Sequence, residues 1–437
     1  MNKHLVLVFS LVGSLVFTQA KGQAVPDTSA SLSLDQAIHE VLKNQPSLDE
    51  IQANIKAIQA GIHQIHDSGY YPKVAANADY ERIDPVSSFN IGGTPEDIMP
   101  HNNYNFNVSI DQTIYDFGRT QADINLAHSR MLSTQDRTKE VKWTLSYYTA
   151  QIYYGILFLQ HSIDVENEQI TTLQHDLELV KKRQEGGTAT NYDLLTTKVQ
   201  IATEQNRKVD LQNQRNKQVI ALRKLMGWDQ SHPVVLQGKL TLPDTSAILK
   251  QPIVNLNNRP DYQLLVDQKN VYEKQYQLAR TIELPSLNAG VTGGWKNGYI
   301  ADLKKLYKNW SFGINLRVPI FSGYKSRYQQ QEAKAHMEAV DDQQRDLQRT
   351  IQSQIAMANS DYEAASQKLN TAKLQIQQAQ EQIKLARLRY ENGVITSQDL
   401  LDSETKLAQA KLQRLSYIYK MILSRYDLDK AIGKHIW

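Results

Sequence analysis

The sequence contains no cysteine in its 437 residues, so the chain can form neither a disulfide nor a lipid-modified N-terminal cysteine. Net charge is almost absent as well. The 49 Lys and Arg residues exceed the 46 Asp and Glu residues by only three, which gives no indication of a nucleic-acid partner. Tryptophan and phenylalanine are scarce, although tyrosine is common. With a mean hydropathy of −0.51, this composition favours long, solvent-exposed helices over a compact globule.

Long hydrophobic runs are also missing, apart from one near the N-terminus. Residues 5–17 are largely apolar, follow a short basic start and precede small residues at Ala20 and Ala24. This pattern is typical of a secretory signal peptide and is too short to cross a bilayer as a helix. We therefore expect residues 1–20, or alternatively 1–24, to be a signal peptide. No later run predicts a transmembrane helix.

Motifs of enzyme active sites are absent too: there is no nucleophile elbow, P-loop or glycine-rich dinucleotide turn. His63 and His66 are three residues apart and could share a ligand, but no carboxylate accompanies them at a suitable spacing. They are better interpreted as residues on a helix surface. The sequence therefore predicts no enzyme, no catalytic residue, no cofactor and no metal site.

The sequence does contain an internal repeat with an offset of 206 residues. Residues 179–202 are identical to the later copy at nine of 24 positions, where chance would give about one or two. Each copy predicts a helix end, a tight turn and a new helix. Gly187 and Gly393 supply a positive φ that ends the first helix, and Thr190 and Thr396 cap the second. The sequence thus predicts two long helical hairpins with matching tips.

The repeat divides the whole chain into two halves with the same order of helix, strand, strand, long helix and shorter helix. Between residues 118 and 185 no proline interrupts the helical pattern, so a helix roughly 100 Å long is possible. The predicted segments are a first repeat at 21–226 with strands at about 72–83 and 103–115 and a hairpin tip at 185–193, a connector at 227–260, and a second repeat at 261–437 with strands at about 286–295 and 309–321 and a tip at 391–399.

Two of the predicted strands alternate strictly between apolar and polar residues. An apolar sheet face exposed to water favours aggregation, so this face needs a cover. A small sheet packed on helices in a soluble α+β protein is one interpretation, and a membrane-spanning sheet of strands about ten residues long is the other. In the second, the lipid-facing residues are Tyr104, Phe106, Val108, Ile110, Trp310, Phe312, Ile314 and Leu316, and the lumen-facing residues are Asn105, Asn107, Ser109, Asn315 and Arg317.

Four strands are too few to close a barrel, since closure takes about eight. A dimer would supply eight strands and a trimer twelve, and only the larger barrel leaves a passage through its centre. The long helices would then continue the barrel as a tube. A coiled-coil spacer with a solid core is the alternative for the helices, but it leaves the polar strand face unexplained.

These features in this order resemble the TolC-like outer-membrane efflux factors. The resemblance rests on the twofold repeat, on the strand-to-helix junctions QTIYDFGR (112–119) and VPIFSGYK (318–325), and on the tips GTATNYDLL and GVITSQDLL. It implies a mainly α fold with a transmembrane β-barrel contribution: a homotrimer with a twelve-stranded barrel in the cell outer membrane and an α-helical tunnel in the periplasm. The implied partners are outer-membrane lipid, a periplasmic adaptor (membrane fusion protein) and an inner-membrane pump for efflux or type I export.

The resemblance also implies a gate at the mouth of the tunnel. Its positions match Asp399 and Asp402 for inward-facing aspartates, and Tyr390 with Asp193 for a polar link between neighbouring hairpins. A family arginine is replaced here by Ile395, which removes the charged half of the link. Asp399 and Asp193 also suit the positive first turn of a helix, which is a simpler explanation for them. Asp402 has no such explanation, because its repeat counterpart is Thr196.

The hairpin tips are expected to meet the adaptor, whereas the basic run at 181–183 is interpreted as solvated helix surface. A soluble periplasmic coiled-coil scaffold or adaptor is the alternative function, although adaptors usually carry one hairpin and lack this twofold repeat. The expected adaptor-facing residues are Gly187, Thr190, Leu194, Leu195, Gly393, Thr396, Leu400 and Leu401.

Overall fold

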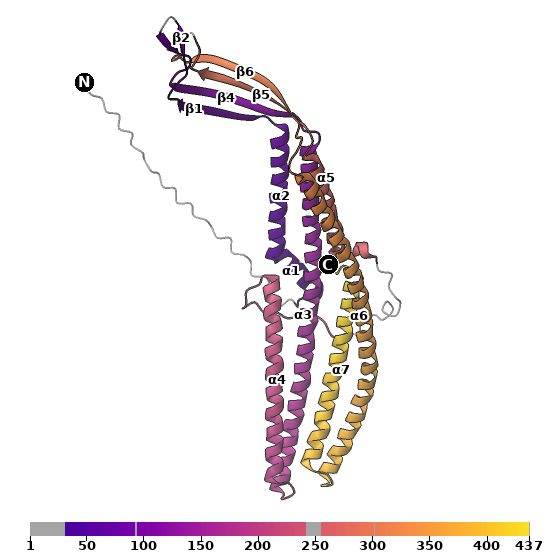
Figure 1. Ribbon diagram of the computed structural model, residues 1–437. Coiled ribbons are helices and arrows are strands. Elements are labelled where there is room, and N and C mark those ends of the chain that lie inside the picture. Colours follow the sequence, from indigo (N-terminus) through magenta and orange to yellow (C-terminus); the bar gives the residue numbers. More distant parts are fainter. Residues whose placement is uncertain (1–30, 92–93, 242–254, 301, 437) are drawn as a thin grey trace, which may run out of the picture.

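The computed structural model describes residues 31–91, 94–241, 255–300 and 302–436. The expected signal peptide and residues 242–254 of the expected connector lie outside these ranges. The molecule is a long rod with a β-sheet at one end, from which helices run to two hairpin turns at the other (Figure 1). No helix of the described ranges is both long and apolar enough to span a bilayer.

The elements repeat in the predicted order, with α2, β1, β4, α3 and α4 in the first half and α5, β5, β6, α6 and α7 in the second. α3 and α6 each contain 67 residues, which corresponds to about 100 Å of helix. The elements are α1 (Leu34–Asn44), α2 (Pro46–Tyr70), β1 (Lys73–Arg82), β2 (Ser88–Ile91), β3 (Thr94–Asp97), β4 (Asn102–Tyr115), α3 (Arg119–Glu185), α4 (Asn191–Met226), the 3₁₀ turn η1 (Leu256–Asn258), α5 (Pro260–Thr281), β5 (Ser286–Lys296), β6 (Tyr307–Arg317), α6 (Lys325–Glu391) and α7 (Ser397–Ala431).

Two details of the strands differ from the prediction. The segment between β1 and β4, for which no strand was predicted, contains the short antiparallel hairpin β2–β3. The strand expected to reach residue 321 ends at Arg317. Pro319 explains the second difference, because it has no backbone N–H to donate to a neighbouring strand.

The main sheet is antiparallel with the order β1-β4-β5-β6, so the strands from the two halves of the chain meet at β4 and β5. Directly opposed residues of such a sheet point to the same face. Val108 is opposite Ala76 on β1 and Gly293 on β5, and Gly293 is opposite Trp310 on β6. The apolar positions therefore share one face across all four strands.

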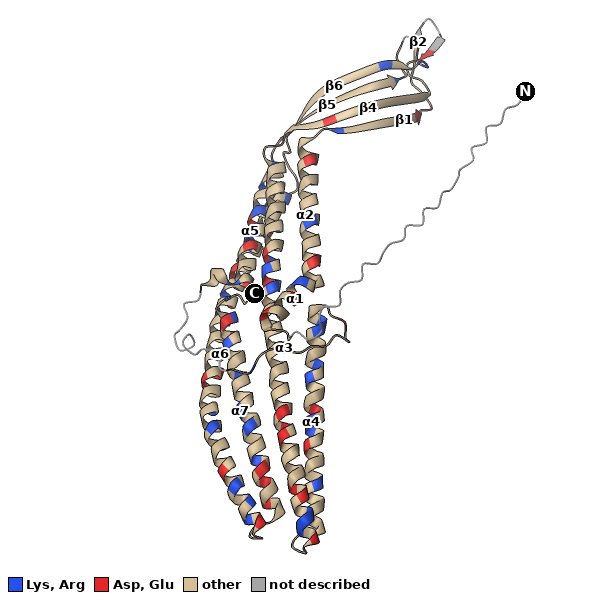
Figure 2. Cartoon of the chain, turned by 180° about the vertical axis from the view of Figure 1, so that it is seen from behind, with Lys and Arg blue, Asp and Glu red and all other residues tan. Residues whose placement is uncertain are grey.

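The opposite face of the sheet carries mostly polar side chains and glycines in the same register. Asn107 is opposite Asn77 and Gly294, and the Asn77 side-chain amide donates to Asn107 Oδ1 at 3.0 Å. Figure 2 shows few charged residues on the sheet and many along the helices. One sheet thus carries an apolar face and an opposite, mostly uncharged polar face.

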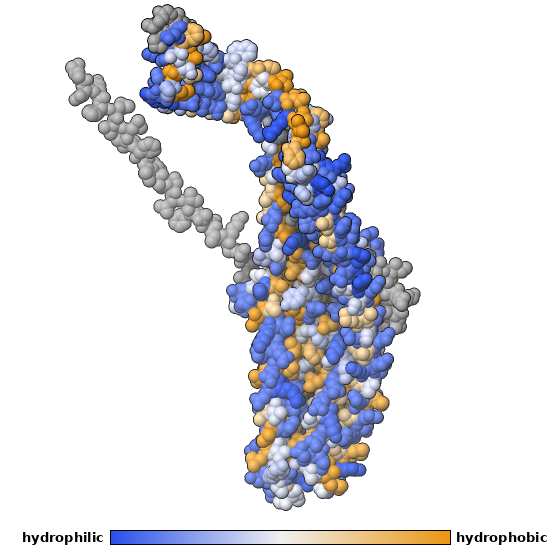
Figure 3. Space-filling model, viewed as in Figure 1, coloured by the Kyte–Doolittle hydropathy of each residue, from blue (hydrophilic) through white to orange (hydrophobic). Residues whose placement is uncertain are grey.

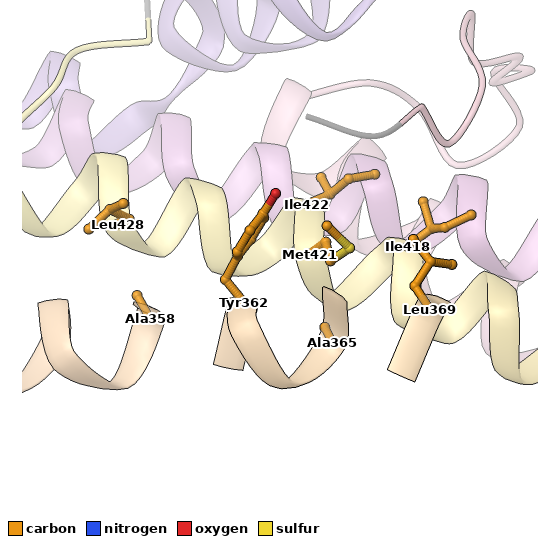
Figure 4. Packing of buried hydrophobic residues seen from close by; sticks show 8 residues of the cluster. All are labelled: Ala358, Tyr362, Ala365, Leu369, Ile418, Met421, Ile422 and Leu428. Carbon is orange, nitrogen blue, oxygen red and sulfur yellow. The ribbon is translucent and has the colours of Figure 1, made fainter. Parts of the chain in front are cut away.

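The hairpin helices pack through a seam of small side chains. On α6, alanines recur every seven residues at buried positions, namely Ala358, Ala365, Ala372, Ala379 and Ala386. A seven-residue repeat keeps one seam facing a neighbouring helix, and alanine permits a close approach. Figure 4 shows Tyr362 and Leu369 of the same seam pointing toward Ile418, Met421 and Ile422 on α7. The buried cores of the lower rod thus lie along the lines where helices touch.

Candidate functional site

The two hairpin tips have the geometry that the repeat predicts. Gly187 and Gly393 have φ values of 75° and 72°, in the left-handed region that glycine adopts without strain. The next helix begins with a capping box, in which Thr190 Oγ1 accepts from the Asp193 N–H and Asp193 Oδ2 accepts from the Thr190 N–H. Thr396 and Asp399 form the same pair of bonds. Both aspartates therefore stabilise helix ends.

Asp193 also links the two hairpins. Its Oδ1 accepts a hydrogen bond from Ser397 Oγ at 2.5 Å, which joins the first turn of α4 to the first residue of α7. The pKa of Asp193 lies below its usual value. The hydrogen bond from Ser397 is the largest cause, and the hydrogen bond from Thr190 is the next. Asp193 is therefore ionised near neutral pH. Its partner across the hairpins is Ser397, and the predicted pairing with Tyr390 is wrong for this conformation.

Tyr390 is linked to Arg183 instead. The ring of Tyr390 packs among Val180, Ala386 and Leu400, and its buried hydroxyl has no hydrogen-bond partner. The guanidinium carbon of Arg183 lies 4.5 Å from the ring centroid, and Arg183 Nη1 donates to the Tyr390 carbonyl oxygen. The interpretation of residues 181–183 as solvated surface is therefore wrong for Arg183, although Lys181 does remain at the surface.

Asp399 and Asp402 lie on one side of α7, and their side chains line the same groove beside Ile395. Hydrogen bonds from Thr396 lower the pKa of the exposed Asp399, and Asp402 Oδ1 accepts from Gln398 Nε2 at 2.7 Å. The same groove contains Arg389 and Lys406, two cations that sequence reasoning did not place there. Within one chain, the two carboxylates are thus close to an equal number of positive charges.

The two leucine pairs of the tips lie in different surroundings, although their sequences repeat. Leu195 is 52% exposed, whereas Leu400 and Leu401 are 2% and 3% exposed. Leu400 packs in the Tyr390 cluster, and Leu401 packs with Leu173 and Ile201. The prediction that Leu400 and Leu401 face an adaptor is therefore wrong. Exposed apolar side chains at the tips come instead from Tyr192, Leu195 and Val394.

The apolar face of the sheet is exposed in the single chain, and every residue predicted to face lipid is exposed on it, up to 80% at Trp310. An apolar surface of this extent marks an interface with lipid or protein. Figure 3 shows hydrophobic residues also gathered where the sheet meets the helices. Tyr115 is one of the exposed aromatic residues of this junction. The others directly flank the strands but were not predicted from the sequence; they are Tyr70, Tyr71, Phe117, Phe321, Tyr324 and Tyr328.

Comparison with known proteins matches this architecture to one family. The family model described as outer membrane efflux protein covers residues 37–228 and 254–434. The pyoverdine export outer membrane protein OpmQ of Pseudomonas aeruginosa is 23% identical over 398 residues, covering 90% of this chain and 78% of the relative. The outer membrane protein TolC of Vibrio cholerae is 22% identical over 292 residues, covering 65% and 66%.

Solved structures share the fold. The outer membrane protein VceC from Vibrio cholerae superposes with a TM-score of 0.74 at 20% identity, covering 92% of this chain and 96% of that chain. CusC superposes with a TM-score of 0.75 at 16% identity and covers 92% of each chain. At these identities the likeness shows the fold alone, and it confirms the expected combination of helical tunnel and barrel strands.

Proposed function

The chain belongs to the outer membrane efflux protein family, and from this premise we propose that it is the passive exit duct, located in the cell outer membrane, of a tripartite efflux or type I export system. The observation that carries the proposal is the sheet with one apolar face and one polar, mostly uncharged face. A soluble scaffold would leave the apolar face in water. A barrel wall places that face against lipid and the polar face against a water-filled passage.

Assembly follows from the edges of the sheet. β1 and β6 form its two edges, and within the described residues the outer side of neither strand is paired. Unpaired edges are satisfied when the β6 of one chain pairs with the β1 of the next. Three chains then close a barrel of twelve strands, which is wide enough for a passage, whereas two chains would close an eight-stranded barrel filled by side chains.

The helical rods then continue the passage into the periplasm, and the hairpin tips form its far end. The exposed tip residues Tyr192, Leu195 and Val394 supply an apolar contact for a periplasmic adaptor, which connects the duct to an inner-membrane pump. Gly187 and Gly393 determine the shape of this contact surface, because their positive φ values allow the two turns to form. Such partners are also consistent with the names of two relatives, a pyoverdine export outer membrane protein and an alkaline protease secretion protein.

The gate of the duct is the groove beside Asp399 and Asp402. Three copies around an axis bring six carboxylates to one constriction, where they attract cations. Arg389 and Lys406 moderate this field. Ile395 supplies no hydrogen bond to a neighbouring hairpin, so the mouth relies on the Asp193–Ser397 and Arg183–Tyr390 contacts to stay shut.

Conductance of the purified protein in planar lipid bilayers tests this function. We expect cation-selective channels whose selectivity falls when Asp399→Asn and Asp402→Asn are combined. Ile395→Arg should lower the resting conductance, because a guanidinium can form charged hydrogen bonds.

The matched control replaces two exposed tip acids outside the groove, Glu185→Gln with Glu391→Gln, and should keep the parent selectivity. Absence of any channel activity from intact, correctly assembled protein contradicts the duct. Unchanged selectivity in the double Asn variant shows that the constriction lies elsewhere.

A further inference from the structure

α3 carries three carboxylates that each face a carboxylate of a different helix, with one cation beside each pair. Two like charges that meet inside a protein are costly unless one of them is neutralised by a proton. The three groups are Asp136 with Asp267 of α5 and Lys139, Glu166 with Glu204 of α4 and Arg207, and Asp176 with Glu404 of α7 and Arg387. Only the last of these connects the first hairpin to the second.

Asp176 and Glu404 are almost completely buried, at 3% and 1% exposed. Arg387 Nη2, from α6, donates to Asp176 Oδ1 at 3.1 Å and to Glu404 Oε1 at 2.9 Å. The other oxygen of each carboxylate is buried and receives no hydrogen bond from a donor. A buried oxygen in this condition is unfavourable, and a proton on one carboxyl group supplies the donor that the other lacks.

Charge balance leads to the same arrangement. Without a proton, the group contains two negative charges and one positive charge, whereas with one shared proton it is neutral. Burial, together with the hydrogen bond and charge of Asp176, raises the pKa of Glu404 to about 9, against the opposing charge of Arg387. The packed hairpins therefore hold a proton that an exposed carboxyl group would release.

We propose that Asp176, Glu404 and Arg387 form a proton-dependent clamp that holds the two hairpins together, and that losing the shared proton loosens it. The clamp acts on the mouth described under the proposed function, and its effect on conductance rests on that function. Glu404 lies seven residues beyond Ser397, about 10 Å along α7 from the tip. The clamp thus adds a contact between charged side chains about one to two helical turns away from the tip. At the tip itself, Ile395 provides no such contact.

Other charged and titratable groups face this region but do not replace the clamp. Glu168 of α3 and Lys411 of α7 form an ion pair at 2.6 Å, but Glu168 is 62% exposed and so is screened by water. Arg183 and Tyr390 lie closer to the tip, where they contact each other.

The Glu166–Glu204 pair with Arg207 joins α3 to α4, and therefore lies within the first hairpin. The Asp136–Asp267 pair with Lys139 joins α3 to α5, outside the two hairpins. Neither pair spans the contact between hairpins. Asp193 does span it through Ser397, but its lowered pKa keeps it ionised at neutral and alkaline pH, so the pH response of the contact in that range is assigned to Asp176 and Glu404.

The direction of the pH effect follows from the raised pKa. When the hairpins separate, water reaches Glu404 and its pKa returns toward the ordinary value of 4.5. The packed state binds the proton more tightly, so its extra stability is complete below that value and is lost as pH rises through about 9. The clamp therefore stabilises the packed hairpins at acidic pH and loses this effect at alkaline pH.

Distance measurement between spin labels tests the clamp directly. Because the chain has no cysteine, Gln174→Cys on α3 and Lys384→Cys on α6 place two unique labels on exposed positions of the two hairpins. Labelled chains are diluted with unlabelled chains during assembly, so that each measured distance lies within one chain. Spectra are recorded in lipid from about pH 4 to about pH 10, on both sides of the window set by Glu404.

We expect the parent distance to lengthen across this window. Glu404→Gln keeps a donor for Asp176 at every pH, so its distance should stay short throughout, and Asp176→Asn should behave in the same way. Glu168→Gln, the exposed control, should keep the parent transition. The proposal is overturned if the parent shows no transition, or if Glu404→Gln shows the same transition as the parent.

Conductance recorded on the same samples distinguishes a failure of the clamp hypothesis from a failure of the proposed gate. A distance transition without any change in conductance supports the clamp and contradicts the proposed gate. A rise in conductance with pH that disappears in Glu404→Gln supports both. A rise in conductance that remains in Glu404→Gln, together with a distance transition that also remains in that variant, assigns the pH response to other groups and overturns the clamp.

Discussion

Replacing Arg183 by methionine should open the resting duct, because this side chain joins the two hairpins at the tip. The guanidinium carbon lies 4.5 Å from the Tyr390 ring centroid, and Nη1 donates to the Tyr390 carbonyl oxygen. A cation–π contact contributes about 0.5–2 kcal/mol, and a hydrogen bond from a charged donor about 1.5–3 kcal/mol. Methionine keeps the packing of the aliphatic stem, and Arg183 is partly exposed, so we expect a net loss of about 2 kcal/mol.

A loss of about 2 kcal/mol in one chain corresponds to at least about a 30-fold increase in the ratio of open to closed channels, since 1.4 kcal/mol is a factor of about ten and the proposed trimer contains three copies of the contact. Single-channel recording in planar bilayers measures this ratio. Lys182→Met is the matched control, because Lys182 is the exposed neighbour on the same helix. Parent-like gating in Arg183→Met would refute the assignment, as would an equal effect of Lys182→Met.

Three further variants test local features of the hairpins. Tyr390→Phe should keep the parent thermal unfolding temperature and gating, because the hydroxyl is buried without a partner; a loss of stability would reveal a hydrogen bond not formed in this conformation. Gly187→Ala should cost about 1 kcal/mol at its φ of 75°, whereas Gly186→Ala, at −78°, should cost little; protease cleavage at the tip compares them, and equal rates would contradict the turn geometry. Leu401→Ala should destabilise the helices by about 2–5 kcal/mol in urea unfolding, while its exposed repeat counterpart Leu195→Ala should cost below about 0.5 kcal/mol; equal losses would contradict the different burial of the two.

The parts of the fold that depend on short segments follow from the sequence. Glycine in the turns and a threonine three residues before an aspartate determine each tip locally, and both tips have the predicted geometry. The strict alternation from Tyr104 to Ile110 likewise predicts a two-faced strand. In the structure, the register of the four strands extends this alternation across the whole sheet. The apolar and polar faces of the sheet therefore agree with the alternation in the sequence.

The parts that depend on which helices pack together were not predictable. Arg183 and Arg389 are repeat copies with similar local sequence, yet Arg183 stacks on Tyr390 while Arg389 lines the groove beside Asp399. The leucine pairs of the two tips differ in burial for the same reason. The contact between Asp176 and Glu404 joins residues 228 positions apart, and no spacing along the chain indicates it.

The most direct test of the duct is the orientation of the sheet faces in the outer membrane. Single cysteines at Phe106 and Ile314 on the apolar face, and at Asn107 and Asn315 on the polar face, are treated with a small water-soluble maleimide in intact membranes. The account predicts labelling at Asn107 and Asn315 and protection at Phe106 and Ile314, because lipid covers the apolar face and water fills the lumen. Equal labelling of all four positions would contradict a barrel wall.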